Sequence, residues 1–178
     1  MSIPNHRSIS PNLIKAYRQA IYVVHLGDRE IALQVNQASL PLAKLMEEWE
    51  VTTAAFLTAF NPYSQVLDPA ENEARQKQMW VDALSMCPKI FPGIGRDKND
   101  QWPHELSMLA LGIGLQDAQA LADQYEQNAY LWISNEQGFV SLKLRHTMRS
   151  LVSKSSMSGL KASHRLICWL SCEVPTQI

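Results

Sequence analysis

Apolar and polar positions divide the start of the chain into a short helix and a hairpin. Residues 10–19, "SPNLIKAYRQ", begin with Ser10 and Pro11. This pair is typical of a helix start, because a serine can cap the first turn and a proline lacks the N–H that would be unpaired there. Residues 21–35, "IYVVHLGDREIALQV", place two apolar runs on either side of Gly27 and predict a β-hairpin.

The middle of the chain shows stronger periodicity. Residues 53–60, "TAAFLTAF", are apolar throughout and predict a buried strand. A helix is predicted to follow, with Asp68 as its cap, Pro69 at its first position and Glu71 three residues after the cap. The other segments predict helices over 39–48 and 115–128 and strands over 90–94, 106–113, 129–134 and 138–144.

Between residues 53 and 134 the order is strand, helix, strand, strand, helix, strand. This order is that of the split βαβ, or ferredoxin-like, arrangement, in which two helices cover one face of an antiparallel sheet. We therefore predict an α+β two-layer sandwich with a ferredoxin-like (βαββαβ) core, preceded by an N-terminal helix and a β-hairpin. Residues 1–144 are predicted to form one domain. Residues 145–178 are predicted to be a Ser-rich extension, loosely docked or disordered.

Charge separates this extension from the rest of the chain. The 178 residues carry 16 basic and 17 acidic side chains. Five basic residues and one acidic residue lie in 145–178, which leaves 11 basic and 16 acidic residues in 1–144. An acidic body argues against nucleic acid as the main partner, because phosphate binding needs a positive field. The basic extension offers a route to a protein partner.

Composition indicates a cytoplasmic protein. The sequence contains no apolar run of membrane-spanning length and no apolar segment near its start that would suit a signal peptide. Three cysteines, an odd number, suit a reducing compartment, so we expect no disulfides. His164, Cys168 and Cys172 recur every four residues, but a helix would spread them over about 12 Å, too far for one ion. We expect no metal site and no cofactor.

A polar cluster follows the predicted strand over 53–60. Asn61 offers an amide donor and acceptor, Tyr63 a stacking face and Ser64 a hydroxyl, just before a helix start, where ligands tend to collect. The alternative is a simple turn, because Asn-Pro is a turn signal and the asparagine can bond its own backbone.

Asn72 and Arg75 lie three residues apart on the next predicted helix. At 100° per residue they share a side with Met79, opposite an apolar stripe, and so do not face the sheet. Arg75 could bind a carboxylate or phosphate there, or this side could be a solvated helix face. The apolar stripe consists of Ala70, Ala74, Trp80, Val81 and Leu84.

Two further segments supply candidate residues. Trp102 precedes a proline and could close over apolar surface, while His104 and Glu105 could act as base and orienting acid. Adjacent residues of an extended chain point to opposite sides, which weighs against that pair. Gln127 and Asn128 close the second core helix, either as caps, with Asn128 in the left-handed position, or as amides in the Asn61 pocket.

Several motifs are spread along the chain: "AYR" at 16–18, "FLTAFNP" at 56–62, "ENEARQ" at 71–76, tryptophan at 102 followed by "ELSMLALGI" from 105, and "ADQYEQNAYLW" at 122–132. In this order they resemble the bacterial family known as domain of unknown function 3293. The resemblance runs from about residue 13 to residue 144 and implies a small cytoplasmic domain without an established activity.

The sequence favours a non-enzymatic binding or regulatory module for a small polar ligand, because amides and one arginine gather at element ends without a recognisable nucleophile. One alternative is a small enzyme acting on a polar metabolite, with Arg75 and Glu105 as its charged groups. A second is a protein–protein interaction module. The candidate ligand-binding residues are Asn61, Tyr63, Ser64, Asn72, Arg75, Trp102, Glu105 and Gln127.

Overall fold

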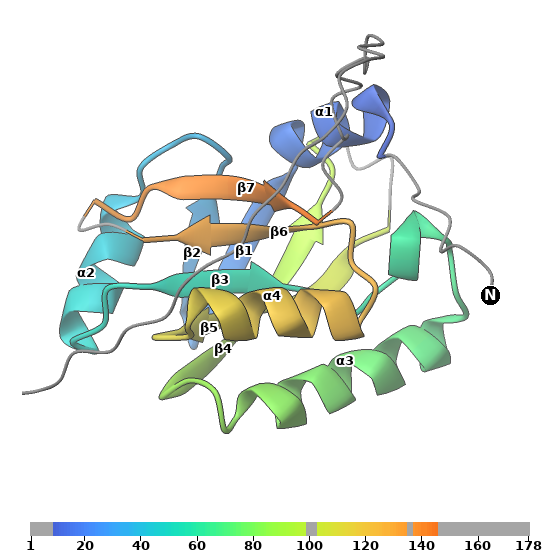
Figure 1. The fold of residues 1–178 in the computed structure, drawn as a ribbon. Coiled ribbons are helices and arrows are strands. Elements are labelled where there is room, and N and C mark those ends of the chain that lie inside the picture. Colours follow the sequence, from blue (N-terminus) through green and yellow to red (C-terminus); the bar gives the residue numbers. More distant parts are fainter. Residues whose placement is uncertain (1–8, 99–102, 135–136, 146–178) are drawn as a thin grey trace, which may run out of the picture. The chain divides into compact units, whose positions relative to one another are not determined.

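The computed structural model describes residues 9–98, 103–134 and 137–145 (Figure 1). The predicted extension from residue 146 onward and Trp102 lie outside the described residues. Along the chain the elements are α1 (Pro11–Gln19), β1 (Ile21–Leu26), β2 (Arg29–Leu33), α2 (Leu40–Glu48), β3 (Ala54–Leu57), a 3₁₀ turn (Pro62–Ser64), α3 (Pro69–Ala83), β4 (Lys89–Arg96), β5 (Glu105–Leu111), α4 (Leu115–Gln124), β6 (Ala129–Ile133) and β7 (Val140–Leu144).

The local signals at the element starts are confirmed. The Ser10 hydroxyl accepts a hydrogen bond from the backbone N–H of Leu13, and Pro11 opens α1. The Asp68 carboxylate accepts from the backbone N–H of Ala70 at 2.9 Å. The hairpin turns at Gly27, whose φ of 66° is a conformation that glycine adopts at little cost.

All seven strands belong to one sheet, in the order β2-β1-β4-β5-β3-β6-β7, and every neighbouring pair is antiparallel. The hairpin and the last strand extend this sheet on its two sides. The sheet is strongly curled into a half-barrel (Figure 1). Backbone bonds from the segment after β2 to β7 strengthen the curl: Asn36 N–H donates to Val140 O, and Val140 N–H donates to Gln37 O.

Both faces of the sheet are buried at its central strands β5, β3 and β6, which explains why these strands read as continuous apolar runs. In β3, Ala54 and Phe56 belong to one buried cluster, whereas Ala55 and Leu57 belong to the other. Helices α3 and α4 cover the Ala55 face, and α2 covers part of the opposite face. The predicted two-layer sandwich is therefore wrong. A third layer is present because the curl leaves a concave face that α2 partly fills.

The buried face of α3 differs from the sequence interpretation. Asn72, Gln76 and Met79 are buried, whereas Val81 and Leu84 of the supposed apolar stripe are 58% and 60% exposed. The prediction that Asn72 and Met79 face away from the sheet is wrong. The polar members of the buried face hydrogen-bond to the chain that leaves β3, as described below, and this compensates for their burial.

A carboxylate links the two helices on the Ala55 face. Asp82 of α3 accepts hydrogen bonds from Tyr125 Oη, Gln124 Nε2 and Gln78 Nε2, at 2.7, 2.7 and 2.8 Å. The bond from Tyr125 is the main cause that lowers the pKa of Asp82 below its ordinary value of 3.8. The ionised form therefore helps to hold α3 against the end of α4.

Two glycines of β4 offer a matched test of packing. A Cβ atom on Gly93 would lie 2.6 Å from both the Phe56 ring and the backbone oxygen of Val23. The Val23 oxygen belongs to the paired backbone of β1, so moving it aside would cost free energy. On Gly95 the nearest atoms would lie 3.8 Å away or more, which is ordinary contact. We expect Gly93→Ala to lower the free energy of unfolding by about 1–3 kcal/mol and Gly95→Ala to change it little, as measured by urea unfolding. Equal effects would contradict this account of the β4 packing.

Asp82 predicts an acid-dependent loss of stability. The folded-state pKa of Asp82 lies below its ordinary value of 3.8, so the stabilisation from its ionised carboxylate is complete at pH values well above 3.8. This stabilisation is lost as the pH falls below 3.8 and through the folded-state pKa. The Asp82→Asn variant cannot titrate, so its free energy of unfolding should fall less than that of the wild type over this range. Urea unfolding from about pH 6 to pH 2.5 measures the difference. Parallel curves would show that Asp82 contributes nothing to the acid dependence.

Candidate functional site

The concave face of the sheet, which α2 partly covers, holds an open pocket of about 220 Å³. No residue of α2 lines this pocket. Side chains from β1 and β7, near opposite sides of the strand order, line it together because the sheet is curled. Helix α1 forms one wall. The lining is mainly apolar and includes Leu13, Ala16, Tyr17, Tyr22, Phe56, Phe60, Tyr130, Leu131 and Leu142, with Thr58, Asn61, Ser64, Arg96, Asp97, Glu105, Ser107 and Gln127 as polar members.

The loop from β3 to α3 has an uncommon backbone. Asn61, Tyr63 and Ser64 all have positive φ, at 48°, 53° and 59°. Side chains other than glycine pay a steric cost in this region, and such residues often cluster at functional sites. Asparagine tolerates it better than most residues, which explains Asn61 but not Tyr63 or Ser64.

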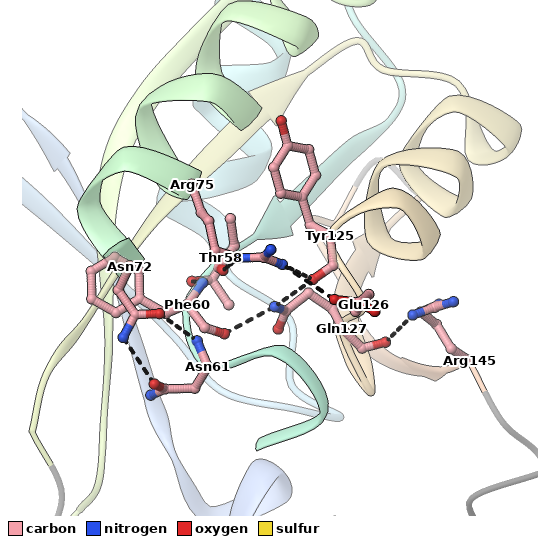
Figure 2. A network of polar contacts seen from close by, with 10 residues as sticks. Thr58, Phe60, Asn61, Asn72, Arg75, Tyr125, Glu126, Gln127 and Arg145 are labelled. Carbon is pink, nitrogen blue, oxygen red and sulfur yellow. Dashed lines mark hydrogen bonds and ion pairs between the residues drawn. The ribbon is translucent and has the colours of Figure 1, made fainter. Parts of the chain in front are cut away.

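Asn61 is held by its neighbours so that its amide group points into the pocket. Its backbone N–H donates to Asn72 Oδ1 at 2.8 Å, and its own Oδ1 accepts from Asn72 Nδ2 at 2.9 Å and from Leu67 N at 3.2 Å. These bonds fix which end of the Asn61 amide is the donor. Its Nδ2 then donates to Glu105 Oε1 at 2.7 Å. Figure 2 shows Asn61 and Asn72 in this arrangement.

Glu105 begins β5 and is the carboxylate that Asn61 positions. It pairs in register with Gly95, so the position opposite it carries no side chain. Burial raises the pKa of Glu105, and the hydrogen bond from Asn61 offsets part of this rise. A half-buried carboxyl with a raised pKa is typical of binding and catalytic sites.

Arg75 binds the backbone rather than facing the pocket. Its Nε donates to Ala59 O at 3.1 Å, and its Nη2 donates to Tyr125 O at 2.9 Å and lies 3.8 Å from Glu126 Oε2 (Figure 2). The guanidinium therefore connects the end of β3 to the end of α4. Because Nε and Nη2 both serve protein acceptors, Arg75 is a structural cation here.

The segment between α4 and β6 supplies two more amides. Gln127 Nε2 donates to Phe60 O at 2.9 Å, and Asn128 Nδ2 donates to Ser64 Oγ at 3.0 Å. Glu126, with φ of 57°, occupies the left-handed position, so the prediction that Asn128 occupies it is wrong. Both amides instead reach the loop that carries Asn61.

Helix α1 is attached to the same loop. Tyr17 Oη and Ser64 Oγ lie 2.8 Å apart and share a hydrogen bond, and Tyr22 Oη donates to Tyr17 O at 2.8 Å. Burial is the largest cause that raises the pKa of both tyrosines, and the negative charge of Glu105 contributes to each rise. Both hydroxyls are therefore neutral at physiological pH and close enough to Glu105 to feel its charge.

The structure divides the predicted site residues into two groups. Four line the pocket: Asn61, Ser64, Glu105 and Gln127. Asn72 and Arg75 stand behind the loop and hold it, and Tyr63 is not part of the lining. Sequence reasoning missed several residues of the lining, among them Tyr17, Tyr22, Thr58 and Ser107. Of these, Ser107 could have been found from strand alternation, because it is two residues from Glu105.

The described residues form neither a metal site nor a membrane-spanning helix. Within the described ranges, no three His, Cys, Asp or Glu side chains are placed to hold a metal ion. The set of His164, Cys168 and Cys172 lies outside those ranges. In the same part of the chain, no helix is long and apolar enough to cross a membrane. Arg145, assigned to the extension, donates to Gln127 O at 2.8 Å and forms an ion pair with Asp123.

The backbone role of Arg75 predicts a large loss of stability on substitution. The Arg75→Met variant keeps much of the side-chain length but removes the donors to Ala59 O and Tyr125 O. We expect the free energy of unfolding to fall by about 2–4 kcal/mol, because buried acceptors lose charged donors. The control is Lys77→Met on the exposed side of α3, with an expected change below about 0.5 kcal/mol. Urea unfolding at neutral pH would contradict this role if the two variants behaved alike.

Comparison with known proteins gives one match. Residues 57–130 match the family described as "Protein of unknown function (DUF3293)". This span is narrower than the resemblance expected from 13–144, and it contains Asn61, Arg75, Glu105 and Gln127. Neither the curated proteins nor the solved structures contain a significant match to the chain. Between residues 57 and 130, therefore, the chain carries a DUF3293 domain.

Proposed function

We propose that this domain binds a small amphiphilic molecule in the pocket on the concave face of the sheet. The observation that carries the proposal is the lining itself. Aromatic and aliphatic side chains form most of a cavity of about 220 Å³, and a few fixed polar groups gather near Asn61 and Glu105. Apolar walls with a small number of oriented polar groups are characteristic of small-molecule sites.

The polar groups are preorganised. Asn61 is fixed by Asn72, and the loop around it is fixed by Arg75 and Gln127. Ordering such groups before the ligand arrives reduces the entropic cost of binding. The sequence predicted a ligand that is polar throughout. The mainly apolar lining favours instead a molecule that is mainly apolar and has one polar end.

The enzymatic alternative assigned Arg75 and Glu105 to one site. The bonds that Arg75 makes to backbone oxygens direct its charge away from the pocket, so nothing favours that pairing over simple binding. A protein partner for the basic extension is a separate proposal, because residues 146–178 lie outside the described residues.

We also propose that the centre of the sheet is a ferredoxin-like core to which β1, β2 and β7 have been added. The strand order β4-β5-β3-β6, with α3 and α4 on one face, supports this interpretation. The added strands matter for function, because Tyr22 of β1 and Leu142 of β7 complete the pocket walls.

Filling the pocket tests the proposed function. Gly95 lines the pocket, and a Cβ atom added to it would lie 3.8 Å or more from Tyr22 and Ser107, which leaves room for a side chain. We expect Gly95→Leu to fold, to occupy this space and to abolish the chemical-shift changes that a library of small amphiphilic compounds produces in pocket amides of the wild type. The matched control is Ala74→Leu on the exposed face of α3, which should bind as the wild type does.

Two results would overturn the proposed function. One is a library that produces no saturable shifts in residues around the pocket. The other is binding that Gly95→Leu leaves unchanged, since the site would then lie elsewhere.

A further inference from the structure

Among the described residues, the carboxylate of Glu105 has no charged partner. Its Oε1 accepts one hydrogen bond, from Asn61 Nδ2 at 2.7 Å, and among the described residues nothing bonds to Oε2. No Lys, Arg or His side chain of those residues forms an ion pair with it. Arg96 lines the pocket from the end of β4, but it forms none of the ion pairs of the described residues with Glu105.

Three hydroxyl groups of the pocket donate to backbone oxygens. Thr58 Oγ1 donates to Leu106 O at 2.7 Å, Ser107 Oγ donates to Glu105 O at 3.1 Å, and Tyr22 Oη donates to Tyr17 O. Tyr17 Oη shares its bond with Ser64. None of these bonds reaches the second oxygen of Glu105, so that oxygen can accept a hydrogen bond from a ligand.

The walls around this carboxylate suit a cation. Tyr17, Tyr22, Phe56 and Phe60 all line the pocket, and the Tyr22 and Phe56 rings meet edge to face with centroids 5.6 Å apart. Aromatic rings attract cations through the negative charge on their faces, and more strongly where water is excluded. An unpaired carboxylate and aromatic walls thus favour the same kind of ligand.

We propose that the ligand of this pocket carries a protonated amine, which donates to Glu105 while its apolar body lies against the aromatic walls. This inference rests on the proposed function and adds the charge of the ligand. A charge-assisted hydrogen bond between ammonium and carboxylate is stronger than a neutral one, and Asn61 holds the acceptor in place for it. Burial raises the pKa of Glu105, and a bound cation would act in the opposite direction.

The test compares compounds that differ only in their polar end. A panel of small aryl and alkyl skeletons is prepared, each as a primary amine, an alcohol and a carboxylic acid, with 2-phenylethylamine, 2-phenylethanol and 3-phenylpropionate as the first set. Dissociation constants are measured by titration in ¹H–¹⁵N correlation spectra. We expect amines to bind at least about tenfold more tightly than the matched alcohols and acids.

The variant Glu105→Gln examines whether the preference comes from this carboxylate. Glutamine keeps the shape and an acceptor oxygen for Asn61 Nδ2, so the loop should keep its structure. We expect the preference for amines to fall to about threefold or less while the alcohols bind as before. The control is Glu73→Gln on the exposed side of α3, which should retain the preference.

The outcomes separate this inference from the proposed function. Alcohols that bind as tightly as amines, with binding lost in Gly95→Leu, would overturn the charge assignment and leave the pocket in place. Tighter binding of the acids would overturn the assignment as well. An amine preference that survives Glu105→Gln would show that another group selects the cation. A panel without any binder would overturn both.

Discussion

The structure depends on how the chain leaves strand β3. Beyond Leu57 the strand loses its neighbours, yet five consecutive backbone groups, from Ala59 N–H to Asn61 N–H, are buried or half-buried and need partners. Side chains provide all five. The partners are Gln76 and Arg75 for Ala59, Thr58 and Gln127 for Phe60, and Asn72 for Asn61. Three of them come from one face of α3, which acts in place of a neighbouring strand.

The replacement of a neighbouring strand by side chains of α3 explains several features together. The buried face of α3 is polar at Asn72 and Gln76 because it meets backbone groups, and apolar at Met79 and Ala83 because it meets the sheet. The side-chain oxygen of Gln76 accepts a hydrogen bond from Ala59 N–H, whereas its nitrogen is buried and has no hydrogen-bond partner among the described residues. This unpaired donor lowers the stability of the same junction. The left-handed residues that follow are held by these bonds, so the position of Asn61 toward Glu105 results from stability rather than from a bound ligand.

Local signals predicted the elements well, because each depends on residues within one turn of one another. Ser10 before Pro11 and Asp68 before Pro69 are examples. Glu105 and Asn61 could be selected as site residues because they stand at strand ends. The pocket itself could not be predicted, since Tyr17, Tyr22 and Leu142 meet only after the sheet curls, and curl has no local signature. The interpretation of α3 failed because it assumed that a buried helix face is apolar.

Helix α1 has a different relation to the rest of the domain than the other helices. None of its residues is fully buried, whereas α2, α3 and α4 each bury three or more. The Tyr17 hydroxyl bonds the side chains of Ser64 and Asn128, and the Tyr22 hydroxyl donates to the backbone oxygen of Tyr17. Segments with few buried contacts open locally at the lowest free energy. Helix α1 is thus a wall of the pocket and also the helix that the domain holds least firmly. The ligand proposed above would enter and leave by brief detachment of α1, while the strained loop and Glu105 keep their positions.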